Sequence, residues 1–162
     1  MSVLLYRDIN PAHLTTLLDK YSMVITTIPD HEDIPGSFWK ESEAGLIKNT
    51  LFLRNDTPVH SALHEACHYI CMDEARRQQL DTDAGGSAIE ENGVCYLQIV
   101  LSRHISEMGI DRMLNDMDEW GYSFRLGSAR AWYEQDAEDA FEWLLASGLI
   151  TPESRPTWQV RQ

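Results

Sequence analysis

The chain has 162 residues, of which 43% are hydrophobic, and its formal net charge at pH 7 is −13. This hydrophobic content argues against disorder, and the length fits one domain, which we place at residues 1–150, with a loose C-terminal tail at residues 151–162. The acidic balance excludes a surface that tracks nucleic-acid phosphates, because such binding depends chiefly on Lys and Arg. A substrate that is steered by charge is expected to be basic.

The N-terminal residues Met1 to Asp8 lack the positive start and apolar core of a secretory signal peptide. The sequence contains no apolar run of about 18 residues, so we expect no membrane-spanning helix. Three cysteines form no disulfide framework, and Cys67 and Cys71 are expected to be small buried side chains. These features predict a cytoplasmic protein.

The first third of the chain predicts a helix, a strand and a hairpin. Asn10 and Pro11 begin a short amphipathic helix, and the β-branched stretch 23–28 predicts a strand. Residues 45–47 and 50–54 predict a hairpin that turns at Lys48 and Asn49. We expect Thr50 to Arg54 to be an edge strand beside the motif that follows, because a free strand edge can pair with an extended peptide.

Residues 64–68 read His-Glu-Ala-Cys-His, an H-E-x-x-H motif within a stretch of helical apolar period that begins at Thr57 and Pro58. On a helix, His64 and His68 share one face and can bind the same Zn²⁺. Glu65 stands next to the first ligand, where a general base is required. His60 is about 12 Å from His68 along the axis, which is too far to share the ion, so we expect a surface or supporting role for it.

A catalytic zinc normally takes three protein ligands. The extended motif that supplies a third His fails here, since Cys71 and Glu74 occupy its Gly and final His positions. A second helix is expected from Ser87 to about Leu101, and it opens with Glu90 and Glu91.

We favour Glu91 as the third ligand, because it shares a polar stripe with Cys95 and Gln98 on an otherwise apolar helix. Glu90 is the alternative, although Ser87 and Glu90 also fit a capping box. Asp81 and Asp83 are weaker candidates, because the Gly-Gly stretch that follows them makes their loop flexible, whereas metal ligands need rigid supports.

The C-terminal half predicts two more helices. Residues 111–120 form the first, and the second runs from Ser128 to about Ala146, before Gly148.

The pairing of His64-Glu65-x-x-His68 with a glutamate about twenty residues later resembles the gluzincins. In this short form, residues 36–101 look most like the ImmA/IrrE-like metallopeptidases. The resemblance implies an α+β fold, a mostly helical single domain with a small antiparallel sheet and an H-E-x-x-H helix packed on the Glu-bearing helix. It also implies cleavage of a protein partner, such as a repressor-like regulator.

The residues therefore predict a zinc-dependent hydrolase, an intracellular endopeptidase in which His64, His68 and Glu91 (or Glu90) hold Zn²⁺. Glu65 would take a proton from water and pass it to the leaving amine. An oxyanion-stabilising donor is also needed, and spacing does not choose among four candidates: Tyr96, His104, Tyr122 and Arg130. Two other interpretations stay open, a catalytically idle metal-binding or protein-interaction module that acts through its acidic surface, and a hydrolase of a non-peptide amide.

Overall fold

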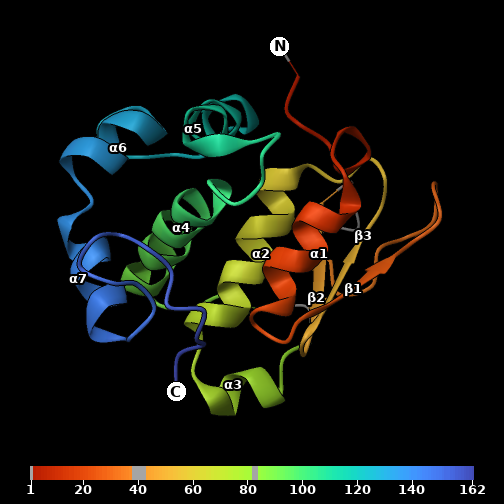
Figure 1. Cartoon of the computed structure of the whole chain (residues 1–162), viewed down its shortest axis with the longest axis horizontal. Coiled ribbons are helices and arrows are strands. Elements are labelled where there is room, and N and C mark those ends of the chain that lie inside the picture. Colours follow the sequence, from red (N-terminus) through yellow and green to blue (C-terminus); the bar gives the residue numbers. More distant parts are fainter. Residues whose placement is uncertain (1, 38–42, 82–83) are drawn as a thin grey trace.

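The computed structural model describes residues 2–37, 43–81 and 84–162 (Figure 1). The fold is α+β, as the sequence predicts, with most of its secondary structure in helices and one small sheet. Helix α2 lies between the sheet and helix α4, and the later helices pack on the far side of α4 (Figure 1).

The sheet consists of β1 (Val24–Thr27), β2 (Gly45–Ile47) and β3 (Thr50–Leu53) in the order β1-β3-β2. The predicted hairpin is confirmed, because β2 pairs antiparallel with β3. Two expectations were wrong. The sheet is mixed, since β1 pairs parallel with β3. Strand β3 is consequently the central strand and not an edge, and its Leu51 and Leu53 are fully buried.

The N-terminal segment contains the 3-10 helix η1 (Tyr6–Asp8) and helix α1 (Pro11–Asp19). The side chain of Asn10 accepts a hydrogen bond from the Ala12 N–H, which caps α1 as the sequence predicts. One face of α1 is buried at Leu14 and Leu18.

Helix α2 (Val59–Cys71) carries the H-E-x-x-H motif. It begins one residue later than expected, with Pro58 at the cap, because the Thr57 hydroxyl accepts a hydrogen bond from the Arg54 N–H instead of capping the helix. A five-residue helix, α3 (Glu74–Gln78), follows. Helix α4 (Ala88–Ser102) begins as predicted, with the Ser87 hydroxyl accepting from the Glu90 N–H.

The C-terminal helices are α5 (Gly109–Trp120), α6 (Ala129–Gln135) and α7 (Glu138–Ala146). The single helix expected over residues 128–146 is thus divided into α6 and α7. The helical path breaks at Asp136, whose φ is −138° and whose carboxylate is paired with Arg125. The chain can then turn α7 onto α4, where the two helices pack together.

Residues 151–162 were expected to be a loose tail, but they lie against the body of the protein. The Arg161 N–H donates to the Ile70 carbonyl at the end of α2. Trp158 packs on Tyr21, with ring centroids 5.7 Å apart, and on His104 at 4.9 Å. Aromatic burial and backbone hydrogen bonds therefore fix this segment in place. Within the described ranges, every helix is too short or too polar to cross a membrane.

Candidate metal centre

Helices α2 and α4 bring three potential metal ligands together. His64 and His68 lie one turn apart on α2, and both turn their Nε2 atoms toward the Glu91 carboxylate on α4. The distances are 3.0 Å from His64 Nε2 to Glu91 Oε1 and 3.3 Å from His68 Nε2 to Glu91 Oε2. All three ligand atoms lie within 4.8 Å of one another. Two ligands of a tetrahedral zinc, each about 2.0–2.1 Å from the ion, are about 3.3 Å apart, so the spacing suits this ion.

Gln98 determines which nitrogen of His64 is free to bind a metal. The Gln98 Nε2 atom lies 3.1 Å from the His60 carbonyl oxygen, which can only accept a hydrogen bond. The amide orientation is thereby fixed, and Gln98 Oε1 faces His64 Nδ1 at 2.8 Å. The neutral His64 ring therefore donates through Nδ1 and keeps a lone pair on Nε2, directed at Glu91, whereas the protonated ring also donates from Nε2 to that carboxylate. A cation between Nε2 and the carboxylate would relieve the repulsion between these two acceptors.

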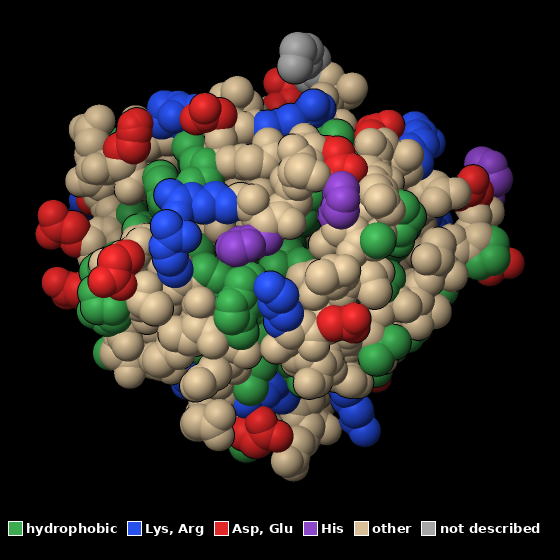
Figure 2. All heavy atoms as spheres, in the orientation of Figure 1, with side chains coloured by type: hydrophobic (Ala, Val, Ile, Leu, Met, Phe, Trp, Pro, Cys, Tyr) green, Lys and Arg blue, Asp and Glu red, His purple; other side chains and the backbone are tan. Residues whose placement is uncertain are grey.

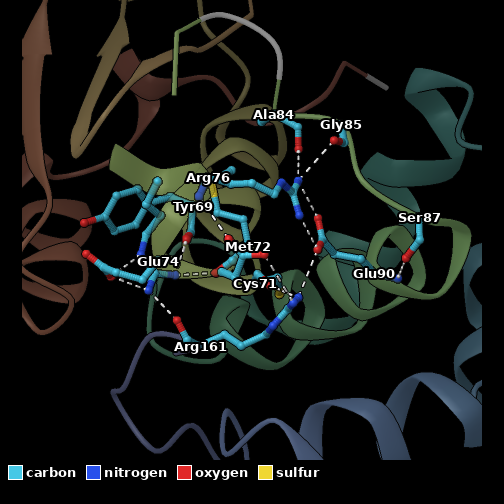
Figure 3. A network of polar contacts seen from close by, with 12 residues as sticks. Tyr69, Cys71, Met72, Glu74, Arg76, Ala84, Gly85, Ser87, Glu90 and Arg161 are labelled. Atoms are coloured by element: carbon cyan, nitrogen blue, oxygen red, sulfur yellow. Dashed lines mark hydrogen bonds and ion pairs between the residues drawn. The ribbon is translucent and has the colours of Figure 1, made fainter. Parts of the chain in front are cut away.

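The neighbouring Glu90 is occupied elsewhere. Its carboxylate is buried and accepts hydrogen bonds from Arg76 Nη1 at 2.7 Å, Arg76 Nη2 at 2.9 Å and Arg161 Nη1 at 3.0 Å (Figure 3). Arg76 also donates to the carbonyls of Ala84 and Gly85 in the loop before α4 (Figure 3). Of the two glutamates considered from the sequence, only Glu91 faces the histidines.

Among the described residues, the other sequence candidate for a ligand, Asp81, is not part of this group. Asp81 takes part in an isolated β-bridge with Ile47, and Asp83 lies outside the described residues. His60 is fully buried, so it is not a surface residue. Its carbonyl orients Gln98, and its ring packs on Tyr122 with a centroid distance of 5.5 Å. The supporting role proposed for His60 fits this arrangement.

Burial dominates the electrostatics of Glu65. It raises the pKa of the Glu65 carboxyl to about 7, with His64 acting in the opposite direction and Glu43 and Glu91 adding to the increase. A carboxyl group with a pKa near neutrality can both take and release a proton at physiological pH. The position next to His64 and the shifted pKa together suit a general base.

The two histidines differ in their protonation. Burial lowers the pKa of His68 to about 4, so its ring is neutral at pH 7 and offers a lone pair. Burial also opposes protonation of His64, but Tyr122, Cys95 and Glu91 outweigh it and raise the pKa of that ring. Burial raises the pKa of Glu91, but the hydrogen bond from His64 and the charges of both histidines have the larger effect. The net shift is downward, so the Glu91 carboxylate is ionised. Protons would therefore compete with a metal chiefly at His64.

One of the four oxyanion candidates lies at the centre. The Tyr122 ring is 5.6 Å from the His64 ring, and its hydroxyl oxygen is 3.3 Å from Gln98 Nε2 and 3.2 Å from His60 Nδ1. The other three lie elsewhere: Tyr96 bonds Ser154, His104 packs on Trp158, and Arg130 pairs with Asp111.

The sheet does not offer the peptide-binding edge that the sequence suggested. Strand β3 is paired on both sides, so the placement of Thr50 to Arg54 as an edge strand was wrong. Strand β2 is an edge, but the Leu46 N–H donates to Gly36 and the Lys48 N–H to Leu80. These contacts occupy the outward donors of β2 with the chain's own carbonyls.

The role of Gln98 was not predicted from the sequence, although the polar stripe that contains it was. Glu91 and Gln98 lie two turns apart on α4, so the stripe faces both nitrogens of one histidine ring.

No family model matches the chain, and searches of curated proteins and of solved structures likewise find no similar protein. Assignment of a function therefore depends on the geometry of this centre.

Proposed function

We propose that the protein is a zinc-dependent hydrolase, an endopeptidase that cleaves a protein partner. The observation that carries the proposal is the convergence of His64, His68 and Glu91 beside the half-buried Glu65. This donor set, two His and one Glu, is one that catalytic zinc sites use, with a further position left for the reacting molecules. A purely structural zinc site would require a fourth protein ligand and would have no use for Glu65.

Each residue has a defined role in this proposal. His64, His68 and Glu91 hold Zn²⁺, which, when bound, supplies Lewis acidity that polarises the scissile carbonyl and acidifies water. Glu65 takes the proton of the attacking water and delivers it to the nitrogen of the leaving amine. Gln98 keeps the His64 ring in the tautomer that leaves Nε2 free.

The net charge supports a class of substrate, and the cysteines support a cellular location for the protein. A protein with a net charge of −13 attracts basic segments, so we propose a basic partner, such as a repressor-like regulator. The three cysteines are free and buried, in keeping with our proposal of a cytoplasmic protein.

A catalytically idle module that binds partners through an acidic surface is the alternative. On the face shown in Figure 2, acidic and basic side chains are interspersed, so the negative charge does not form one continuous patch there. The half-buried Glu65 has no purpose in such a module, because placing a carboxylate in a poorly solvated position costs stability.

The Glu65→Gln variant distinguishes the zinc-dependent hydrolase from the catalytically idle module. It removes the base without touching a metal ligand, so zinc binding should persist while turnover falls by at least about 100-fold. Zinc-loaded protein would be incubated with a cell-derived peptide mixture, and new peptide termini counted by mass spectrometry. Glu153→Gln, an exposed glutamate on the C-terminal segment, is the matched control and should retain full turnover. Equal cleavage by wild type and Glu65→Gln would rule out the mechanism, and a wild type that cleaves nothing would favour the idle module.

A further inference from the structure

A pocket opens beside the candidate metal centre on the side away from the sheet. It has a volume of about 330 Å³, and His64 and Glu91 form part of its wall. The remaining wall comes from Asn92 and Cys95 of α4 and from the segment Trp120–Phe124, which connects α5 to α6. A group bound here would therefore lie directly against two of the three potential ligands.

The wall opposite α4 is aromatic and held in place. Trp120 is 47% exposed, and its ring lies 5.1 Å from the ring of the buried His60. Tyr122 and Phe124 are nearly parallel at 6.5 Å, and Phe124 stacks on Trp132 at 4.9 Å. Rings that are fixed before a ligand arrives lose little freedom on binding, so this wall favours a large apolar side chain.

A second hollow continues from the first. Its volume is about 220 Å³, and it shares Asn92, Ser123 and Phe124 with the pocket at the metal centre. Its remaining lining residues are Arg125, Trp132, Asp136 and Asp139. Asp136 is paired with Arg125, whereas Asp139 is exposed at the start of α7. The two hollows together form a groove that is largely apolar near the candidate metal ligands and carries the Arg125–Asp136 ion pair and the exposed Asp139 carboxylate away from them.

We propose that this groove binds the substrate as an extended segment, with a large apolar side chain beside the cleaved bond and a basic side chain further along. The inference rests on the proposed function, because it assumes that the substrate bond to be cleaved lies beside His64 and Glu91. Continuity with the candidate centre and the complementary charge of Asp139 support this occupant. The covered outer edge of β2 removes the competing route of strand addition there.

Binding can be measured without metal or turnover. The probe is the tripeptide amide N-acetyl-phenylalanyl-alanyl-lysine amide, titrated into the metal-free full chain. The readout is the NMR shift of the Ser123 backbone N–H, because Ser123 lines both hollows and is unchanged in every variant used. Replacing phenylalanine of the probe by alanine should weaken binding about 10- to 100-fold, because an apolar side chain is no longer buried. Replacing lysine by glutamate should weaken it about 2- to 5-fold, with less difference at high salt.

Matched variants assign the two ends of the groove. Trp120→Ala should remove the preference for phenylalanine, while Leu126→Ala, an exposed hydrophobic residue outside the groove, should keep it. Asp139→Asn should remove the preference for lysine, and Glu153→Gln should not. Equal binding of all probes, or preferences that survive both groove variants, would overturn the proposal. If the protein binds the probe but no zinc, the groove proposal stands and the hydrolase proposal fails. If it shows zinc-dependent cleavage without these preferences, the hydrolase proposal stands and the groove proposal fails.

Discussion

Gln98 Oε1 accepts a hydrogen bond from His64 Nδ1 at 2.8 Å, while the opposite nitrogen of the same ring faces Glu91. One helix therefore supplies both a candidate metal ligand and the group that sets the tautomer of another candidate ligand. Second contacts of this kind are part of most histidine metal sites, and they affect both affinity and ring orientation.

Gln98→Leu should weaken zinc binding by about 10- to 100-fold, because His64 loses the acceptor that keeps Nε2 unprotonated. Gln98→Glu keeps an acceptor for His64 Nδ1 but loses the N–H that faces the His60 carbonyl, so it should restore only part of the affinity. Chelator competition gives the affinities, and the ¹⁵N shifts of His64 in the metal-free protein report the tautomer directly. A His64 ring protonated on Nε2 in the wild type at high pH would refute the assignment.

Glu90 and Glu91 should have opposite effects when each is replaced by Ala. Glu90→Ala leaves Arg76 and Arg161 without their shared buried carboxylate, so the free energy of unfolding should fall by about 3 kcal/mol. Zinc should still bind to that variant, because its three ligands remain. Glu91→Ala should lose zinc and keep most of the stability of the metal-free fold.

Urea unfolding in the presence of a chelator measures the two stabilities, and metal analysis measures the zinc. A Glu91→Ala variant that retains zinc while Glu90→Ala loses it would move the third ligand to Glu90.

Glu65 should lower the stability of the metal-free protein at neutral and alkaline pH. Its pKa is raised by burial from 4.5 to about 7. Between these two values the folded state holds more protons than the unfolded state, so stability falls as pH rises. Above pH 7 the cost is fully present, and Glu65→Gln should be more stable than wild type by about 1–3 kcal/mol. Below pH 4 the two proteins should be equally stable. Thermal or urea unfolding at pH 4 and pH 8 checks the difference, and the same gap at both values would contradict the shift.

The C-terminal segment should be required for the fold around α2 and α4. Arg161 Nη1 donates to the Cys71 carbonyl and to Glu90 (Figure 3). The Arg161 guanidinium also lies 5.2 Å from the centre of the Trp143 ring. Arg161→Ala should therefore lower the free energy of unfolding by about 1–3 kcal/mol. Arg155→Ala, on the same segment, serves as a control with an expected change below about 0.5 kcal/mol. Equal effects of the two substitutions in urea unfolding would show that the segment is not anchored through Arg161.

Local signals in the sequence predicted the helices that carry the centre. Ser87 caps α4 and the apolar period of α2 places His64 and His68 on one face, because both features depend only on nearby residues. The mixed sheet was not predictable in this way, since the parallel pairing of β1 with β3 joins segments far apart in the chain. The division of α6 from α7 at Asp136 was likewise not predicted from the local pattern; the Asp136 carboxylate there pairs with Arg125, eleven residues earlier in the chain.

The choice between Glu90 and Glu91 shows the same limit of local reasoning. The predicted capping box accounts for the hydrogen bond from the Glu90 N–H to Ser87. It does not account for the Glu90 carboxylate, which forms ion pairs with Arg76 and Arg161. The polar stripe on α4 favoured Glu91 correctly as the residue that faces the histidines, because it reflects the face that the helix turns toward α2.

The most direct test of the account is the zinc content of the full chain, purified without added metal and compared with His64→Ala. Elemental analysis should find about one zinc per wild-type chain and almost none in His64→Ala, since loss of one of three ligands leaves an incomplete site. His13→Ala, which changes a histidine paired with Glu107 away from the centre, should retain the wild-type amount. Equal zinc in all three proteins, or none in the wild type even after zinc is supplied, would contradict the proposed metal centre.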